Sequence, residues 1–281
     1  MKVKIYDEFG AGNSLPVFGA FVDGVGASGG SIVRDYADAD CTVIWSILFA
    51  GRMAPAKEIW ERSKKDGKPV IVLEVGALKR NQTWKVGING INRDATWVKP
   101  FQENRAEKLG ILMKPWRNDG EFITICTQRS DSTQWPENLT IEEWVTEQIE
   151  FCHQMEFNRP IVIRPHPRDR HTHWSFLQKF KNKSIFFDTP QMIMNSYDGY
   201  NHNEIFDRSW MVINHSSGPG VQAVLDGINV LCSESSLAWD VAFDKGFHLD
   251  RTEWLNMLAH TEWTIDEIRE GTPWGKLKDY L

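Results

Sequence analysis

A loop of six small or polar residues, between a short apolar run and an amphipathic stretch, carries the side chains best suited to bind an anion. Residues 211–214 predict a strand, and residues 221–225 predict the start of a helix. Small residues let a ligand approach the backbone closely, and the unpaired amides at a helix start attract anions. The pattern therefore predicts a phosphate-binding loop, which consists of His215, Ser216, Ser217, Gly218, Pro219 and Gly220.

A second strand-to-loop junction lies upstream, at residues 161–170, and it is rich in basic side chains. In an open α/β sheet, ligands bind at the carboxyl ends of the strands, which is where such a loop begins. Either junction alone is equally well explained as an ordinary connection with a helix cap. Together they favour a mono- or diphosphate site, whose basic side chains here are Arg164, His166, Arg168 and Arg170.

The composition indicates an ordinary globular protein. The chain has 281 residues, of which 41% are hydrophobic and 25% are charged, enough for one large domain or two ordinary ones. The net charge of −6 argues against a general nucleic-acid coat protein but permits a local basic face. The four cysteines form no CxxC pair, which predicts buried thiols in a reducing compartment, the cytoplasm. We expect no membrane-spanning segment and no signal peptide, because no apolar run is long enough.

Strands alternate with helices along the chain, which predicts an α/β fold with two Rossmann-like parallel-sheet domains facing a cleft. The expected domains are residues 1–117 and 118–250, followed by a helical segment, 251–281, that packs back on the first domain. Strands are expected at residues 2–6, 39–47, 69–75, 121–126, 160–163, 184–187, 210–214 and 229–232. Helices are expected at residues 16–25 (capped by Ser14), 54–66, 141–155, 173–180, 220–225, 253–258 and 265–269.

Three carboxylates in the first half are candidates for a catalytic base. Asp7 and Glu8 follow the first expected strand and precede a glycine-containing loop, where a loop or helix cap is the alternative explanation. Glu74 lies inside an apolar strand, and a buried carboxylate is costly unless it is paired. Glu74 is therefore either functional or bound to a cation nearby, the choices being Lys79, Arg80 and Lys85.

A basic, tryptophan-containing stretch at residues 79–117 is the best candidate for an acceptor-binding face. Lysine and arginine attract phosphate, and a tryptophan ring can stack on an extruded base. A solvated face with interspersed acids is the alternative. The candidate residues are Glu74, Lys79, Arg80, Trp84, Lys85 and Arg93, with Trp97 and Trp116 as further rings.

Two other sets of side chains were considered. Arg129 follows the first strand of the second half and is a candidate phosphate ligand, although a solvated surface arginine would look the same. His166, His171 and His173 lie close together, but no carboxylate or cysteine shows the spacing of a closed zinc site. We therefore expect no metal site.

Two short runs and a helix resemble motifs of GT-B glycosyltransferases. The runs are Arg164-Pro165-His166-Pro167 and Ser216-Ser217-Gly218, and the helix follows the second run and ends near residues 226–230. The similarity is to the His-Pro and serine motifs of the capsule-type transferases, over residues 120–245. It implies that His166, Ser216 and Ser217 contact the phosphate of a nucleotide-sugar (a UDP-, other NDP- or CMP-sugar), with no tightly bound cofactor. The family usually has an acidic residue in the helix after the serine loop, where this chain offers Gln222 and Asp226.

The first half also looks similar, more loosely, to phage-encoded proteins, which suggests sugar transfer to hydroxymethylated pyrimidines in DNA. The resulting hypothesis is a glycosyltransferase whose second half binds the donor and whose first half presents the acceptor, with double-stranded DNA as a partner and no membrane. A capsule-type transferase acting on surface glycans or polyol phosphates is one alternative. A non-catalytic nucleotide- or nucleic-acid-binding module is the other.

Overall fold

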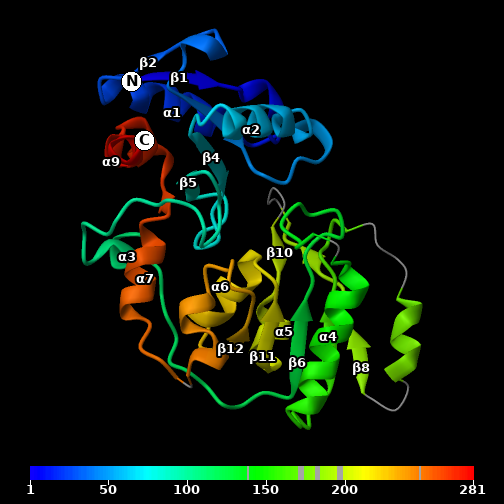
Figure 1. The fold of residues 1–281 in the computed structure, drawn as a ribbon. Helices are drawn as coiled ribbons and strands as arrows, with labels where there is room; N and C mark the ends of the chain where they lie inside the picture. The colour runs from blue at the N-terminus through cyan, green and yellow to red at the C-terminus, as the bar shows by residue number, and fades with distance from the viewer. Residues whose placement is uncertain (138, 170–173, 181–183, 195–198, 247) are drawn as a thin grey trace. The chain divides into compact units, whose positions relative to one another are not determined.

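The structure, a computed structural model, describes residues 1–281 except 138, 170–173, 181–183, 195–198 and 247. The described residues divide into two compact units (Figure 1). Unit 1 contains Met1–Ile111 and Thr252–Leu281, and unit 2 contains Leu112–Arg251. Unit 1 is thus built from two distant parts of the sequence, whereas unit 2 is one continuous segment. Across the described residues, no helix combines the length and the apolar run that a bilayer crossing requires.

Unit 1, all of whose residues are described, contains one sheet with the order β13-β5-β4-β3-β1-β2. Four of its strands are parallel: β1 (Lys2–Ile5), β2 (Ser31–Ile32), β3 (Cys41–Trp45) and β4 (Val70–Val75). The other two are antiparallel to their neighbours: β5 (Trp84–Ile88) and β13 (Glu262–Trp263). The predicted α/β class is confirmed, but these two antiparallel strands were not predicted.

The helices of unit 1 come from both parts of the sequence. They are α1 (Leu15–Ala27), α2 (Ala56–Lys65), α3 (Arg105–Lys108), α7 (Thr252–Ala259), α8 (Ile265–Arg269) and α9 (Thr272–Leu277), with single 3₁₀ turns at Asp7–Phe9, Tyr36–Asp38, Gly51–Met53 and Lys278–Tyr280. The predicted Ser14 cap does not form in unit 1, because the Ser14 hydroxyl donates to Ala11 O instead (2.8 Å).

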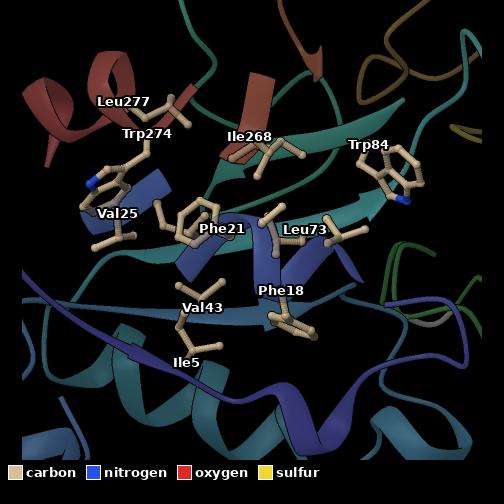
Figure 2. Packing of buried hydrophobic residues seen from close by; sticks show 14 of the residues in the cluster. Ile5, Phe18, Phe21, Val25, Val43, Leu73, Trp84, Ile268, Trp274 and Leu277 are labelled. Atoms are coloured by element: carbon tan, nitrogen blue, oxygen red, sulfur yellow. The ribbon is translucent and has the colours of Figure 1, made fainter. Parts of the chain in front are cut away.

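The core of unit 1 joins its two sequence segments. Figure 2 shows Phe21 of α1 in one cluster with Val43 and Leu73 of the sheet and with Trp274 and Leu277 of α9. Helices α1 and α8 pack so closely that a Cβ added at Gly24 would lie 2.1 Å from Ile268 O. The last part of the sequence therefore completes this hydrophobic core.

A buried arginine also ties the two segments of unit 1 together. Arg105, 1% exposed, donates from Nε to Ala259 O (2.7 Å) and from Nη2 to Glu262 O (2.8 Å). Its guanidinium also pairs with the Glu267 carboxylate (2.5 Å) and lies 3.9 Å from the centre of the Trp263 ring. Each of the three guanidinium nitrogens of this buried cation therefore donates to an acceptor, as its burial requires.

Within the described residues of unit 2, the main sheet has the order β12-β11-β6-β7-β8, and every pairing is parallel. The strands are β6 (Phe122–Cys126), β7 (Ile161–Arg164), β8 (Ile185–Phe187), β11 (Ser209–Asn214) and β12 (Asn229–Leu231). A small antiparallel pair consists of β9 (Gln191–Met192) and β10 (Tyr200–Asn201). All five main strands were predicted, because each is a nearly continuous apolar run, as buried parallel strands are.

The helices of unit 2 are α4 (Ile141–Gln154), α5 (Asn203–Arg208) and α6 (Gly218–Leu225), with 3₁₀ segments at Ser175–Phe180, Trp239–Val241 and Phe243–Lys245. Helix α4 begins with a capping box, in which Thr140 and Glu143 exchange side-chain-to-backbone hydrogen bonds. Its apolar face packs on the sheet through Trp144, Val145 and Ile149. The helix predicted at 173–180 is a 3₁₀ segment over its described part.

Candidate functional site

Three loops leave the sheet of unit 2 at one level of its carboxyl edge. The strand ends Asn214, Cys126 and Arg164 are register partners in adjacent strands, with β6 in the middle. Because neighbouring strands lie about 4.8 Å apart, Asn214 and Arg164 are roughly 10 Å apart. The two loops selected from the sequence therefore start on either side of the loop that follows β6. We call the three loops the serine loop (residues 215–217), the HP loop (165–169) and the bridging loop (127–136), which follows β6 and starts between the other two.

The serine loop leads directly into α6. Ser217 is the N-cap residue, and its side chain forms no capping hydrogen bond with the described part of the helix. Instead, Asn214 Nδ2 donates to Ser217 O (2.9 Å) and lies 3.4 Å from Ser217 Oγ. A Cβ at Gly220 would lie 2.3 Å from Asn214 Oδ1, so only glycine fits there. Because Pro219 has no N–H and the Gly220 amide donates to Ser217 O (3.2 Å), the start of α6 offers the Gly218 amide, with the Ser217 hydroxyl beside it, to an anion.

The two adjacent serines have different surroundings. Ser216 is 6% exposed, and its hydroxyl lies 3.0 Å from Gln134 Oε1 and 3.3 Å from Gln128 Oε1, both in the bridging loop. Ser217 is more exposed, at the helix start. Both were predicted to contact phosphate. In this structure the Ser216 hydroxyl makes internal hydrogen bonds, and Ser217 is the serine available at the surface.

His215, also a candidate ligand residue, is buried beneath the loop at 5% exposure. Its ring lies 5.0 Å from the Trp135 ring and 6.4 Å from the Trp144 ring, centre to centre. Burial lowers the pKa of His215, so the ring is neutral near pH 7. Its carbonyl oxygen accepts hydrogen bonds from the amide (3.0 Å) and hydroxyl (2.9 Å) of Ser233. His215 therefore supports the loop from inside.

The HP loop starts with an arginine that is bound within unit 2. Arg164 is buried and forms an ion pair with Asp188 and a hydrogen bond to Asn201 O. Its guanidinium is therefore engaged by protein groups, unlike the phosphate contact expected from the sequence. Arg168 is exposed. The further candidates Arg170, His171 and His173 lie outside the described residues.

His166 is half-buried, and its proton can be located from its partners. His166 Nδ1 accepts a hydrogen bond from the Arg168 amide (3.1 Å), so the neutral ring carries its proton on Nε2. The His166 amide itself donates to Thr127 Oγ1 of the bridging loop (3.2 Å). His166 can therefore act as an N–H donor without a positive charge.

The bridging loop is bonded to both of its neighbours. Toward the HP loop, Ser130 donates from its hydroxyl (2.6 Å) and its amide (3.2 Å) to Asp169 Oδ1. Toward the serine loop, Gln128 and Gln134 contact Ser216. Sequence reasoning missed these residues, although their position directly after an apolar strand was a signal. Arg129, the residue selected there, forms a two-point ion pair with Asp131 (2.8 and 2.6 Å).

The two residues that stand near the family's usual acidic position, Gln222 and Asp226, lie farther along the chain than the start of α6. Gln222 is half-buried in the second turn of the helix. Asp226 follows the last residue of α6, roughly 12 Å along the axis from its start, and pairs with Lys114 (2.8 Å). Gln222 is therefore the nearer of the two to the helix start. Among the described residues, no three His, Cys, Asp or Glu side chains gather as metal ligands would.

In unit 1 the candidate bases have different exposures. Asp7 and Glu8 are exposed in the turn that follows β1. Glu74 is half-buried on β4, where its Oε1 accepts a hydrogen bond from the Val75 amide (2.7 Å). Its register partner on β5 is Lys85, one of the three cations named as possible partners from the sequence.

The proposed acceptor face is only partly at the surface. Arg80 and Arg93 are exposed and Lys79 is half-buried, but Trp84 and Lys85 are 8% and 7% exposed. The reason is that β5 is an interior strand, covered on its other side by β13, which the sequence did not predict.

A buried carboxylate that sequence reasoning missed organises the loop after β4. Glu262 of β13 accepts hydrogen bonds from the amides of Ala77 (2.6 Å) and Leu78 (3.1 Å) and from the Thr83 hydroxyl (2.7 Å). Burial raises the pKa of Glu262 and lowers that of Lys85, its register partner, while the charge of each partner opposes these shifts. Lys85 Nζ also donates to Ile91 O (3.0 Å). Lys85 is therefore a buried residue that forms contacts inside unit 1, and it is not part of an exposed acceptor face.

Comparisons with known proteins give a fold but no sequence family. No family model matches the chain, and no curated protein matches it. A solved KpsC β-Kdo 2,4 transferase of Thermosulfurimonas dismutans is 13% identical, over 92% of this chain and 90% of that one, with a TM-score of 0.53. A KpsC β-Kdo 2,7 transferase of the same organism is 14% identical, over 96% and 98%, with a TM-score of 0.54. The chain therefore has an α/β fold of the GT-B type and resembles the capsule-type Kdo transferases in structure.

Proposed function

We propose that this chain is a glycosyltransferase that moves a sugar from a nucleotide-sugar to an acceptor hydroxyl, with the donor phosphate bound at the carboxyl edge of unit 2. One observation carries the proposal: the HP loop and the serine loop flank β6 at one edge of the sheet, and both are hydrogen-bonded to the bridging loop. The likeness in fold to two Kdo transferases supports the same reaction class.

The donors at this edge suit the chemistry of a departing nucleotide. The leaving phosphate gains negative charge in the transition state, so groups that interact more strongly with it at that point lower the barrier. The Gly218 amide at the start of α6, the Ser217 hydroxyl and the Nε2–H of His166 are such groups. Each is held by the fold before the ligand arrives, so little reorganisation is needed.

The base, if the reaction inverts the sugar configuration, is proposed to come from unit 1. Asp7 and Glu8 are exposed at the carboxyl end of β1, where a carboxylate can accept the proton of an acceptor hydroxyl. Glu74 is less suited, because it is half-buried opposite Lys85.

For the acceptor we favour a surface glycan of the capsule type over DNA. Recognition of an extruded pyrimidine would need exposed aromatic rings, as would stacking on single-stranded bases. The Trp84 ring is buried, and the half-buried Trp97 donates its Nε1–H to Asn92 O (3.0 Å). Hydroxymethylated DNA therefore stands as the second acceptor in the test below.

The test is a transfer assay on the whole chain with a panel of CMP-, UDP- and other NDP-sugars. Each donor is incubated with oligosaccharides and, separately, with duplex DNA containing hydroxymethylated pyrimidines, and products are identified by mass spectrometry. We expect a mass increase of one sugar on an oligosaccharide. A product only on DNA would replace the glycan acceptor by DNA. Nucleotide binding without transfer would indicate a non-catalytic module, and absence of both would overturn the proposal.

A further inference from the structure

The Ser216 hydroxyl lies among more acceptors than it can satisfy. Among the described residues, its Oγ lies within hydrogen-bond distance of Gln134 Oε1 (3.0 Å), Gln128 Oε1 (3.3 Å) and His215 Nδ1 (3.2 Å). A serine hydroxyl has one proton to donate and two lone pairs to accept with. The two glutamine oxygens already compete for that proton. His215 Nδ1 is therefore the neighbour best suited to donate to Ser216.

The His215 ring can supply that donor. Because its burial keeps the ring neutral, it carries a single N–H, on Nδ1 or on Nε2. With the proton on Nδ1, the hydrogen bonds run in one direction, from His215 Nδ1–H to Ser216 Oγ and from Ser216 Oγ–H to Gln134 Oε1. With the proton on Nε2, three acceptors would face one hydroxyl proton. Directed chains of this kind strengthen each other in a buried site.

This chain of bonds connects the end of β11 with the bridging loop through Ser216, which lies two residues before the helix start. Ser217 follows Ser216 directly, and α6 begins at Gly218. The direction of the Ser217 hydroxyl and of the first α6 amides is therefore set by how Ser216 is held. A small misplacement of such donors is costly for a ligand that needs several of them at once.

We infer that His215 is a positioning residue, which donates from Nδ1 to Ser216 and, with Gln134, holds the serine loop in its anion-binding form. His215 thus acts through Ser216 and does not touch the ligand. The identity of the ligand, a nucleotide phosphate, rests on the proposed function, whereas the hydrogen-bond arrangement does not.

Two substitutions at one position separate this role from simple packing. His215→Phe keeps a ring against Trp135 and Trp144 but removes the N–H. His215→Asn removes the ring but keeps a side-chain N–H at a similar distance from the backbone. We expect His215→Phe to weaken binding of CMP or UDP about tenfold in calorimetric titrations, with thermal stability close to that of the wild type, since one positioned hydrogen bond is lost. We expect His215→Asn to bind within about threefold of the wild type although it unfolds at a lower temperature.

A double-mutant cycle tests whether His215 and Gln134 act together. Gln134→Ala alone is expected to weaken nucleotide binding to a similar extent, and the His215→Phe/Gln134→Ala pair to be little worse than either single variant, as expected for one chain of bonds. Gln154→Ala, at the exposed end of α4, is the control and should bind as the wild type does. Full additivity, or normal binding by His215→Phe, would overturn the inference.

A measurement without ligand keeps this inference separate from the proposed function. Nitrogen-15 NMR shifts of the His215 imidazole in the whole wild-type chain report which ring nitrogen carries the proton. We expect Nδ1–H, together with faster amide exchange in the first turn of α6 in His215→Phe. A proton on Nε2, or unchanged exchange, would exclude the positioning role even if the wild type transfers sugar. If the wild type binds no nucleotide, the proposed function fails, and the NMR result still decides the inference.

Discussion

The two units share one fold class, but the loops within each unit are fixed by different chemistry. In unit 1 the loop after β4 is fixed by Glu262, and the last part of the sequence by Arg105, both of which are buried ionisable side chains. In unit 2 the serine loop is fixed by hydroxyls, amides and a neutral imidazole, whereas the HP loop is also fixed by charged groups, the Arg164–Asp188 ion pair and the Asp169 carboxylate. A carboxylate beside a bound phosphate would repel it, whereas neutral groups do not. The comparison teaches that the buried ionisable residues of unit 1, Lys85, Arg105 and Glu262, stabilise its fold, whereas the serine loop at the proposed anion site of unit 2 is held by uncharged groups.

The largest expected effect is the loss of Arg105. Arg105→Ala should destabilise unit 1 by about 3–5 kcal/mol, because it leaves Glu267 and two backbone carbonyls without their buried partner. Hydrogen exchange followed by mass spectrometry should show lost protection in residues 1–111 and 252–281 only. Arg269→Ala is the control, since the 50% exposed Arg269 pairs with Asp266 at the surface, where about 0–1 kcal/mol is expected. Equal loss of protection in unit 2 would contradict the expectation that Arg105 stabilises unit 1 alone.

The next largest effect separates the two serines of unit 2. Ser217→Ala and His166→Ala should each reduce turnover or donor binding about 100-fold, the cost of losing one donor that stabilises developing charge. Ser216→Ala should have a smaller effect on turnover, but it should lower stability because Gln128 and Gln134 lose the one hydroxyl proton near their oxygens. Steady-state kinetics and thermal unfolding of the three variants provide the check. A variant order in which Ser216→Ala loses most activity would assign the ligand contact to Ser216.

A matched pair of helix caps tests the comparison at the level of stability alone. Thr140 of α4 and Thr264 of α8 form the same capping box, one in each unit. Replacing either by alanine should cost about 1 kcal/mol in its own unit. Thr264→Ala should cost more, because its partner Glu267 also pairs with Arg105. Urea unfolding monitored separately in each unit by hydrogen exchange measures both values, and equal costs would show that the cap and the ion pair are independent.

The smallest expected effect is a pH dependence of the stability of unit 1. Burial lowers the pKa of His260, whose Nε2 accepts from the Phe101 and Gln102 amides (3.2 and 3.3 Å) while Nδ1 lies 2.7 Å from Asn256 O. A lowered pKa means that only the unfolded chain gains a proton as the pH falls below about 6.5, so stability is present above that value and lost below it. At pH 6 the free energy of unfolding falls by at most about 0.8 kcal/mol. This limit is the free energy that the unfolded chain gains when a histidine with an ordinary pKa binds a proton at that pH. Unfolding midpoints between pH 5.5 and 7.5 should fall less with acid in His260→Gln than in the wild type.

The sequence was informative where a single segment determines its own structure. The strand predicted at 69–75 is β4 (Val70–Val75), and the one predicted at 121–126 is β6 (Phe122–Cys126), because continuous apolar runs need no partner to be recognised. Strand β5 was missed because Lys85 interrupts its apolar pattern, and the burial of Lys85 depends on Glu262, far along the chain. The sequence around Lys85 gives no sign that its partner carboxylate lies so far along the chain.

The candidate site shows the same limit. The serine loop and the HP loop leave one edge of the sheet, and both could be selected from the sequence because each is a polar loop directly after an apolar strand. Gln128 and Gln134 were missed because their importance depends on β6 lying between β7 and β11, which is a property of strand order. Likewise, the sequence could not distinguish Ser216 from Ser217, since only packing against the bridging loop makes them different.

The division of unit 1 between two distant stretches of sequence has a consequence during synthesis. Strand β13 and helices α8 and α9 leave the ribosome after unit 2, so the hydrophobic core of unit 1 cannot close until unit 2 has been synthesised. Unit 2 is complete earlier, and we expect it to fold first on the nascent chain although unit 1 begins the sequence. Ribosome-bound chains stalled with residue 251 just outside the exit tunnel should therefore resist protease within 112–251 and be cleaved within 1–111.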